Sequence, residues 1–163
     1  MEAADGSAVN LVRLLLRHFQ GFRDTSIYRG TLVHLYKRAQ ILVGDLWAAY
    51  GRRKEGLYSF RDLDQLTMFA DYRVPQILRE MGIMAYSPAL AARIDGRQEI
   101  ACGSEEEVEI RACTVVAVDM LHKALTSRGL NLLVIEVDWL LWQKGEESKD
   151  SIAPHHRTLT IYY

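Results

Sequence analysis

Asp71 lies in residues 68–75, where aromatic side chains flank a carboxylate just ahead of a predicted helix N-terminus. In such a position a partly dry pocket can hold the carboxylate as a general base, or as a stabiliser of developing positive charge. An aspartate near a helix start also commonly caps the helix by accepting its first free amides. The sequence leaves both roles open for Asp71.

Lys37 and Asp45 form a second candidate group on one predicted helix. Ile41 stands midway between them, so the four-residue spacing puts a cation and a carboxylate on a related face. The alternative is an ordinary solvated helix face. Against it, Asp45 stands within the apolar stretch 42–47, where an unpaired carboxylate would be expensive.

Asp138 stands among branched residues and two tryptophans, Trp139 and Trp142. This pattern fits a polar contact at the wall of an aromatic pocket, as expected for a planar heterocycle. The alternative is an amphipathic core helix with Asp138 on its edge.

The last residues of the chain combine His155, His156 and Arg157 with hydroxyl and phenol groups, Tyr162 among them. They form a candidate anion cradle, because the planar fork of arginine suits phosphate. The histidines are adjacent and no further ligand set accompanies them, so no metal site is predicted. The alternative is a polar tail without a site, although residues 161–163 are apolar enough to dock.

The composition is that of one globular domain with a nearly balanced charge. The 163 residues include 20 Lys+Arg and 21 Asp+Glu, giving a net charge of -1. This balance disfavours intact nucleic acid as the main partner and allows a small anionic ligand. Cys102 and Cys113 have no second pair, so neither a zinc cluster nor a disulfide framework is predicted, and both are expected in the core. With no secretory signal, spanning segment, phosphate loop or dinucleotide fingerprint, we expect a soluble cytoplasmic protein without membrane contact or cofactor.

The apolar spacing predicts helices over residues 9–19 and 32–50, the second ending at Gly51. Asp62 is expected to cap a helix over 63–70 that breaks near 71–73, because Val74 precedes a proline. A further helix should carry Pro75 in its first turn and end at Gly82. Residues 50–57 are expected to form a loop.

Ser87 before a proline predicts a helix that ends at Gly96, and Ser104 with Glu107 forms a capping box for a helix running to about residue 125. Residues 132–137 are compatible with a strand, but the spacing onward to Gly145 favours a helix. Residues 158–163 alternate and should be extended. The sequence therefore predicts a single all-α domain over residues 1–163 with a short extended C-terminal tail.

Seven motifs together resemble those of the queuosine salvage protein family, the queuosine 5'-phosphate N-glycosylase/hydrolases. They occupy residues 21–24, 36–41, 45–47, 67–75, 103–112, 138–142 and 155–163. The resemblance implies a helical-repeat fold akin to DNA glycosylases. It also implies hydrolysis of the N-glycosidic bond of queuosine 5'-phosphate, which releases queuine for tRNA modification.

The resemblance and the chemistry of the reaction together suggest roles for the residues around Asp71. Cleaving a C–N glycosidic bond builds positive charge on the ribose, and Asp71 is chosen to stabilise it and to orient or deprotonate the attacking water. The leaving 7-deazapurine has no ring nitrogen at position seven to protonate, so recognition of the base is part of catalysis. Phe69 and Tyr72 are assigned to stacking, and Asp138 to the donor edge or cationic amine of the base.

The 5'-phosphate is assigned to Lys37, with His156, Arg157 and Tyr162 as weaker candidates. Asp45 either positions Lys37 or belongs to the site itself. Members of the family are about twice as long as this chain, which resembles their C-terminal half. We therefore expect a pocket open on one side and an apolar face exposed where the other half packs.

Two other functions stay open on the sequence. One is a non-catalytic helical fragment that acts as an interaction module, with self-association through the exposed face. The other is a glycosylase acting on polymeric nucleic acid, which the charge balance disfavours.

Overall fold

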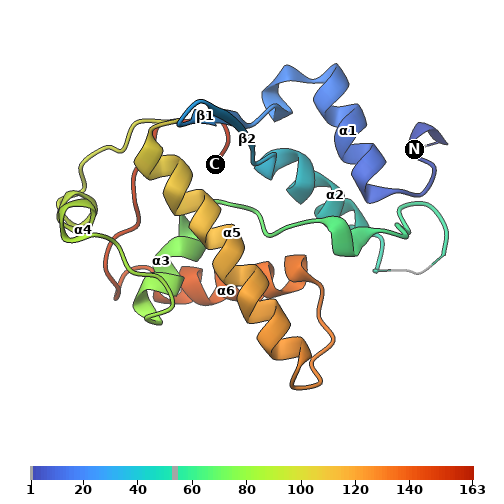
Figure 1. Ribbon diagram of the computed structural model, residues 1–163. Helices are drawn as coiled ribbons and strands as arrows, with labels where there is room; N and C mark the ends of the chain where they lie inside the picture. The colour runs from blue at the N-terminus through green and yellow to red at the C-terminus, as the bar shows by residue number, and fades with distance from the viewer. Residues whose placement is uncertain (1, 53–54) are drawn as a thin grey trace.

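The computed structural model describes residues 2–52 and 55–163. Within them six α-helices surround two packed cores, and a small β-hairpin joins the first two helices (Figure 1). None of the described helices is long and apolar enough to cross a membrane. The elements are η1 (Glu2–Ala4), α1 (Ala8–His18), η2 (Gln20–Phe22), β1 (Thr25–Tyr28), β2 (Thr31–His34), α2 (Lys37–Ala49), η3 (Leu63–Gln65), α3 (Arg73–Glu80), α4 (Pro88–Asp95), α5 (Glu105–Thr126) and α6 (Val134–Ser148).

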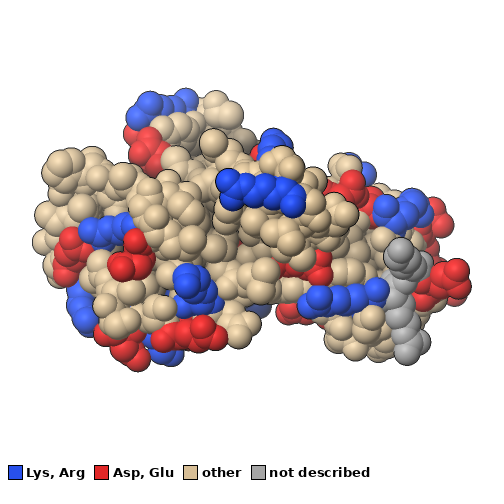
Figure 2. Space-filling model, turned by 90° about the horizontal axis from the view of Figure 1, so that it is seen from below, with Lys and Arg blue, Asp and Glu red and all other residues tan. Residues whose placement is uncertain are grey.

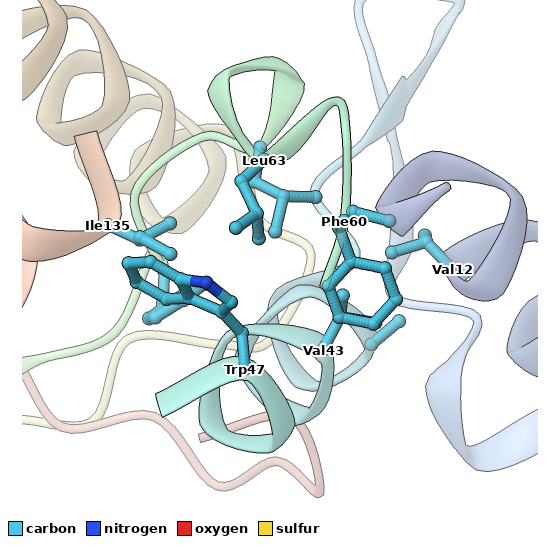
Figure 3. Close-up of a cluster of buried hydrophobic side chains, with 10 residues drawn as sticks. Val12, Val43, Trp47, Phe60, Leu63 and Ile135 are labelled. Carbon is cyan, nitrogen blue, oxygen red and sulfur yellow. The ribbon is translucent and has the colours of Figure 1, made fainter. Parts of the chain in front are cut away.

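The first core lies between α1, α2 and the start of α6. In Figure 3 its side chains point toward one another from these helices and from the 60–63 segment: Val12, Val43, Trp47, Phe60, Leu63 and Ile135. The second core lies between α3, α5 and α6, which pack against each other pairwise. Its most enclosed members are Met68, Val74, Ile77, Leu78, Val118 and Val137.

An extended segment, residues 66–70, lies between the two cores. Leu66 and Phe69 pack in the first core, whereas Met68 and Ala70 pack in the second. The helix predicted over 63–70 is therefore wrong: only the short η3 forms, and the chain then runs straight into α3. Extended backbone places neighbouring side chains on opposite sides, which is what a segment between two apolar layers requires.

Asp62, expected to cap that helix, caps α1 instead. Its Oδ1 accepts from the Ala8 amide at 2.6 Å, and its Oδ2 accepts from the Ser7 hydroxyl at 2.6 Å. Ser7 and Asp62 are 55 positions apart in the chain, so no local sequence pattern indicates this contact.

The chain is mostly helical, as predicted, but it is not all-α. Residues 25–34 form an antiparallel hairpin in which Tyr28 pairs with Thr31. The two turn residues, Arg29 and Gly30, both have positive φ, as in the type I′ turns that suit two-residue hairpin loops. The hairpin uses residues 31–34, so α2 starts at Lys37, five residues later than expected.

The other helices agree with the sequence more closely. Ser87 and Ser104 cap α4 and α5 through their side chains, and α6 forms where a strand was the alternative. Glu107 does reach back, but to the Gly103 amide (3.1 Å) rather than to that of Ser104.

Residues outside the helices give mixed outcomes. Cys102 and Cys113 are exposed, so their expected place in the core is wrong. The end of the chain docks as predicted, through the hydroxyls of Tyr162 and Tyr163, which donate to the Arg23 carbonyl (3.0 Å) and to Glu107 (2.8 Å), although Ile161 stays 66% exposed. Of the loop expected over 50–57, Arg53 and Lys54 lie outside the described residues.

Candidate active site

Asp71 joins the 66–70 segment to α3 and is 6% exposed. Its Oδ1 accepts from the amides of Arg73 (3.0 Å) and Val74 (2.9 Å), so the capping role is confirmed. No described residue donates to its Oδ2, which leaves one carboxylate oxygen for other chemistry. Burial raises the pKa of Asp71, while the two amides and the charges of Lys37 and Arg73 hold it down.

Asp138 projects from α6 onto the same segment and is 4% exposed. Its Oδ1 accepts from the Phe69 amide at 3.1 Å. Burial and the neighbouring charge of Asp71 raise the pKa of Asp138 to about 8. Two close carboxylates cannot both ionise easily. Asp71 has two amide donors and is acted on by both Lys37 and Arg73, whereas Asp138 has one amide donor and Lys37, so Asp71 is the stronger acid and Asp138 keeps the proton at neutral pH.

Lys37 is the cation shared by this group. It is half-buried at the first position of α2. Its positive charge offsets part of the rise that burial causes in the pKa values of Asp45, Asp71 and Asp138. Asp45 lies further along α2 and is exposed, although the surrounding protein still raises its pKa. The structure therefore brings together four of the residues that the sequence singled out, from α2, α6 and the start of α3.

The aromatic residues near Asp138 divide between core and surface. The Phe69 ring is 2% exposed, and its centroid lies 6.4 Å from that of Trp139, which stacks on Trp47. Trp142, by contrast, is 45% exposed, so the two tryptophans beside Asp138 in the sequence do not line one wall. Tyr72 is half-buried, with its ring 4.5 Å from that of His155.

Of the residues expected to form an anion cradle at the chain end, His155, His156 and Arg157 border one cavity, whereas Tyr162 lies apart from it. His156 is 1% exposed, and burial lowers its pKa to about 4, so it is neutral at physiological pH. Arg157 is exposed and borders a cavity of about 450 Å³, together with Arg97, Tyr72 and both histidines. The Tyr162 hydroxyl donates to the Arg23 carbonyl at 3.0 Å and does not border this cavity.

The hydroxyl of Tyr163 fixes the tautomer of His156. That hydroxyl donates its proton to Glu107 (2.8 Å), so the 3.1 Å contact with His156 Nε2 requires a proton on Nε2. His156 Nδ1 is then a bare acceptor, and no described residue donates to it. His156 is therefore suited to receive a hydrogen bond rather than to neutralise a phosphate.

A buried ionic network that the sequence analysis did not identify lies beside these residues. Arg111 of α5 is 1% exposed and pairs with Asp24, which is fully buried, and with Glu107 at 3.4 Å. The sequence did contain a signal: one arginine in the middle of the largely apolar run of α5 must have a buried partner. Among the described residues, no group of three or more His, Cys, Asp and Glu side chains is arranged to hold a metal ion.

Residues 1–163 match the family model described as "Queuosine salvage protein". Proteins from Dictyostelium discoideum and Sphaerobacter thermophilus are 52% and 51% identical to this chain over 99% of its length. A protein from Mus musculus is 36% identical over 96% of the chain. All three are named queuosine 5'-phosphate N-glycosylase/hydrolase, and the chain covers 50%, 49% and 48% of their respective lengths.

Proposed function

Because the chain belongs to the queuosine salvage protein family, we propose that it hydrolyses the N-glycosidic bond of queuosine 5'-phosphate and so releases queuine. The observation that carries this proposal is the pair of buried carboxylates, Asp71 and Asp138, held against one segment with different proton affinities. Two carboxyl groups with separated pKa values are what hydrolysis of a glycosidic bond uses. The chain spans about half the length of the relatives it matches, so activity of this half is part of the proposal.

Asp71 is the group that faces the developing positive charge. Its Oδ1 is fixed by two helix amides, so the free Oδ2 is held in place before the substrate arrives. An ionised Oδ2 in a largely buried site stabilises an oxocarbenium-like ribose more strongly than the same group in water. It also accepts a hydrogen bond from the attacking water and takes its proton as the new C–O bond forms.

Asp138 is assigned to the contact with the nucleobase that leaves. The sequence assigned it to the donor edge or the cationic amine of the base, which requires an ionised carboxylate. With a pKa of about 8 it carries a proton at neutral pH, so we assign it instead to an acceptor atom of the leaving 7-deazapurine, to which it can donate that proton. Because this base has no nitrogen at position seven, activation at another atom lowers the barrier to its departure. Tyr72 follows Asp71 directly and is half-buried, so we favour its ring as the stacking surface over the enclosed ring of Phe69.

The 5'-phosphate is assigned to Lys37, the cation that acts on all three aspartates, and Asp45 orients it from the next turns of α2. Arg157, on the 450 Å³ cavity, is the second candidate. From the resemblance we further propose a DNA-glycosylase-like arrangement of the helices and a cytoplasmic enzyme without a cofactor. The near-neutral net charge supports a small-molecule substrate rather than intact nucleic acid.

Queuine release from queuosine 5'-phosphate, measured by chromatography, tests the proposal. We expect Asp71→Asn to lower kcat by about 100-fold or more, the usual contribution of a positioned acid or base. The fold should survive, because asparagine caps helices almost as well as aspartate. Asp64→Asn, at an exposed position of η3, is the matched control and should turn over like the wild type.

Wild-type turnover by a folded Asp71→Asn variant would remove Asp71 from the mechanism. A folded wild-type chain that releases no queuine would contradict activity of this half, and the interaction module would then be the better description.

A further inference from the structure

Asp24 and Arg111 form an ion pair that is enclosed on all sides. Arg111 Nη1 donates to Asp24 Oδ1 at 2.9 Å and Nη2 donates to Oδ2, so the guanidinium binds both carboxylate oxygens. The side chains are 0% and 1% exposed. The pair connects the second turn of α5 to the turn that precedes the hairpin.

Each partner also holds the backbone beside a residue of the candidate site. Arg111 Nε donates to the Ala70 carbonyl at 3.0 Å, directly before Asp71. Asp24 Oδ2 accepts from the Lys37 amide at 3.1 Å. Lys37 and Asp71 share no hydrogen bond with each other, so the pair is a buried polar connection between their two backbones. A second, more exposed connection runs through Gln40, which donates to the Leu35 carbonyl (3.0 Å) and accepts from the Thr67 amide (2.9 Å).

We propose that the Asp24–Arg111 pair is a positioning device that sets how closely the charge of Lys37 approaches the carboxylate of Asp71. The inference rests on the proposed function for the roles of those two residues. A buried ion pair contributes little net stability, because removing two charges from water costs about as much as their attraction returns. The guanidinium of Arg111 is rigid and holds two carboxylate oxygens and a carbonyl at once, which a pair of apolar side chains could not do.

The end of the chain encloses this pair. Glu107 accepts from both Arg111 Nη1 (3.4 Å) and the Tyr163 hydroxyl (2.8 Å). The Tyr163 ring lies against the guanidinium, with 5.0 Å between Arg111 Cζ and the ring centroid. These contacts keep water away from the pair and restrict the arginine to one rotamer.

Three charged groups act on Asp71: Lys37 from α2, Arg73 from α3 and Asp138 from α6. Arg73 belongs to the helix that Asp71 caps, so it moves with the carboxylate. Asp138 is tied to the same segment through the Phe69 amide. Lys37 is the one of the three that depends on Asp24 and Arg111 for its place, so loosening the pair should weaken its influence selectively.

Arg111→Lys tests this inference, because lysine keeps the charge but cannot reach Asp24 and the Ala70 carbonyl together. The Asp71 carboxyl carbon is followed by NMR across pH without substrate, with Asp71→Asn used to assign the signal. We expect the pKa of Asp71 to rise by about half a unit or more. The acid limb of the kcat profile should move up in pH by the same amount, and kcat should fall about tenfold.

Val118→Ala is the control, because this fully buried residue of α5 does not touch the pair. It should lower stability and leave the pKa of Asp71 unchanged. In Asp24→Asn a looser Lys37 raises the pKa of Asp71, whereas the lost charge of Asp24 lowers it, so this variant is compared by kcat, which should fall as in Arg111→Lys.

An Asp71 pKa that is identical in wild type, Arg111→Lys and Val118→Ala would reduce the pair to a structural role. Unfolding of both pair variants while Val118→Ala stays folded would overturn the inference in the same way. If the wild type releases no queuine, the proposed function fails, while the NMR titration still decides whether the pair positions Asp71.

Discussion

Asp71 and Asp138 carry the same side chain and lie against the same segment, yet their surroundings give them different acidities. Asp71 accepts two amide hydrogen bonds and lies near two cations, whereas Asp138 accepts one amide and has the charge of Asp71 beside it. Donors stabilise the ionised form, and burial next to a like charge stabilises the protonated form. Because of this difference, we assign Asp71 as the general base and Asp138 as the general acid of the proposed reaction.

The raised pKa of Asp138 makes stability depend on pH. Its folded pKa of about 8 exceeds the ordinary aspartate value of 3.8, so the folded state binds the extra proton and loses stability as pH rises from about 4 to 8. Asp138→Asn removes this loss and can keep the acceptor for the Phe69 amide. We expect the variant to exceed the wild type in unfolding free energy by at least about 1.4 kcal/mol at pH 8.5, the value of one pKa unit.

Urea denaturation at pH 5 and pH 8.5 measures this difference. The lowered pKa of His156 gives the opposite slope between about 6.5 and 4, where the folded state resists protonation. That slope is common to both proteins and cancels in the comparison. A variant that gains no more stability at pH 8.5 than at pH 5 would show that Asp138 is already ionised at neutral pH.

The sequence identified Asp71 and Asp138 because each carboxylate has aromatic neighbours in the sequence, and it identified Lys37 through its spacing to Asp45. It did not identify the environment of His156, which is neutral because it is buried and whose tautomer is set by Tyr163 and Glu107. Burial and the choice of hydrogen-bond partner are set by contacts between distant residues, so the neutral state of His156 could not be predicted from neighbouring residues.

At the scale of elements, the candidate site depends on a close approach of α2 to α6. A Cβ atom at Gly44 would lie 3.1 Å from Phe69 Cζ and 3.6 Å from the Trp139 ring. Glycine here lets the Phe69 ring pack directly against the backbone of α2. The Phe69 amide also donates to Asp138, so the packing of α2 affects the position of this carboxyl group.

Gly44→Val should therefore lower the unfolding free energy by about 2 kcal/mol, in the range for overpacking a core. Turnover should fall as well, because a displaced Phe69 carries its amide away from Asp138. Thermal and urea unfolding, together with kcat, check this result. Gly21→Val, where a Cβ meets nothing within 4 Å, should change stability by less than about 0.5 kcal/mol. Equal effects at the two glycines would argue against a tight contact at Gly44.

Elements with strong local signals could be predicted, and those set by tertiary contacts could not. Ser87 and Ser104 mark helix starts through their own side chains. The hairpin was missed because its turn residues, Arg29 and Gly30, differ from the usual Asn-Gly pair. The 66–70 segment has apolar residues on both sides, and periodicity does not separate a short buried extended segment from a buried helix.

At the scale of the whole molecule, the surface does not suit a polyanion. Basic and acidic side chains are interspersed on the face shown in Figure 2, and the net charge is -1. Affinity for a phosphodiester backbone comes from the release of counterions by clustered cations. A single nucleotide needs only one or two such contacts.

We therefore expect a 20-nucleotide single-stranded RNA to bind with a Kd above about 100 µM at 150 mM salt. This value is the weak limit of non-specific binding. Fluorescence anisotropy of a labelled RNA measures this, with a strongly basic RNA-binding domain as the positive control. Micromolar binding that weakens steeply with added salt would instead favour a polymeric substrate.

The extended segment between the two cores has a consequence for how the molecule comes apart. Leu66 and Phe69 belong to one core, and Met68 and Ala70 to the other, so neither core is complete without the same five residues. Helix α6 contributes Ile135 to the first core and Val137 to the second in the same way. Melting either core withdraws side chains from the other, so the two cores unfold as one cooperative unit, and the buried surroundings of Asp71 and Asp138 are lost in that single step.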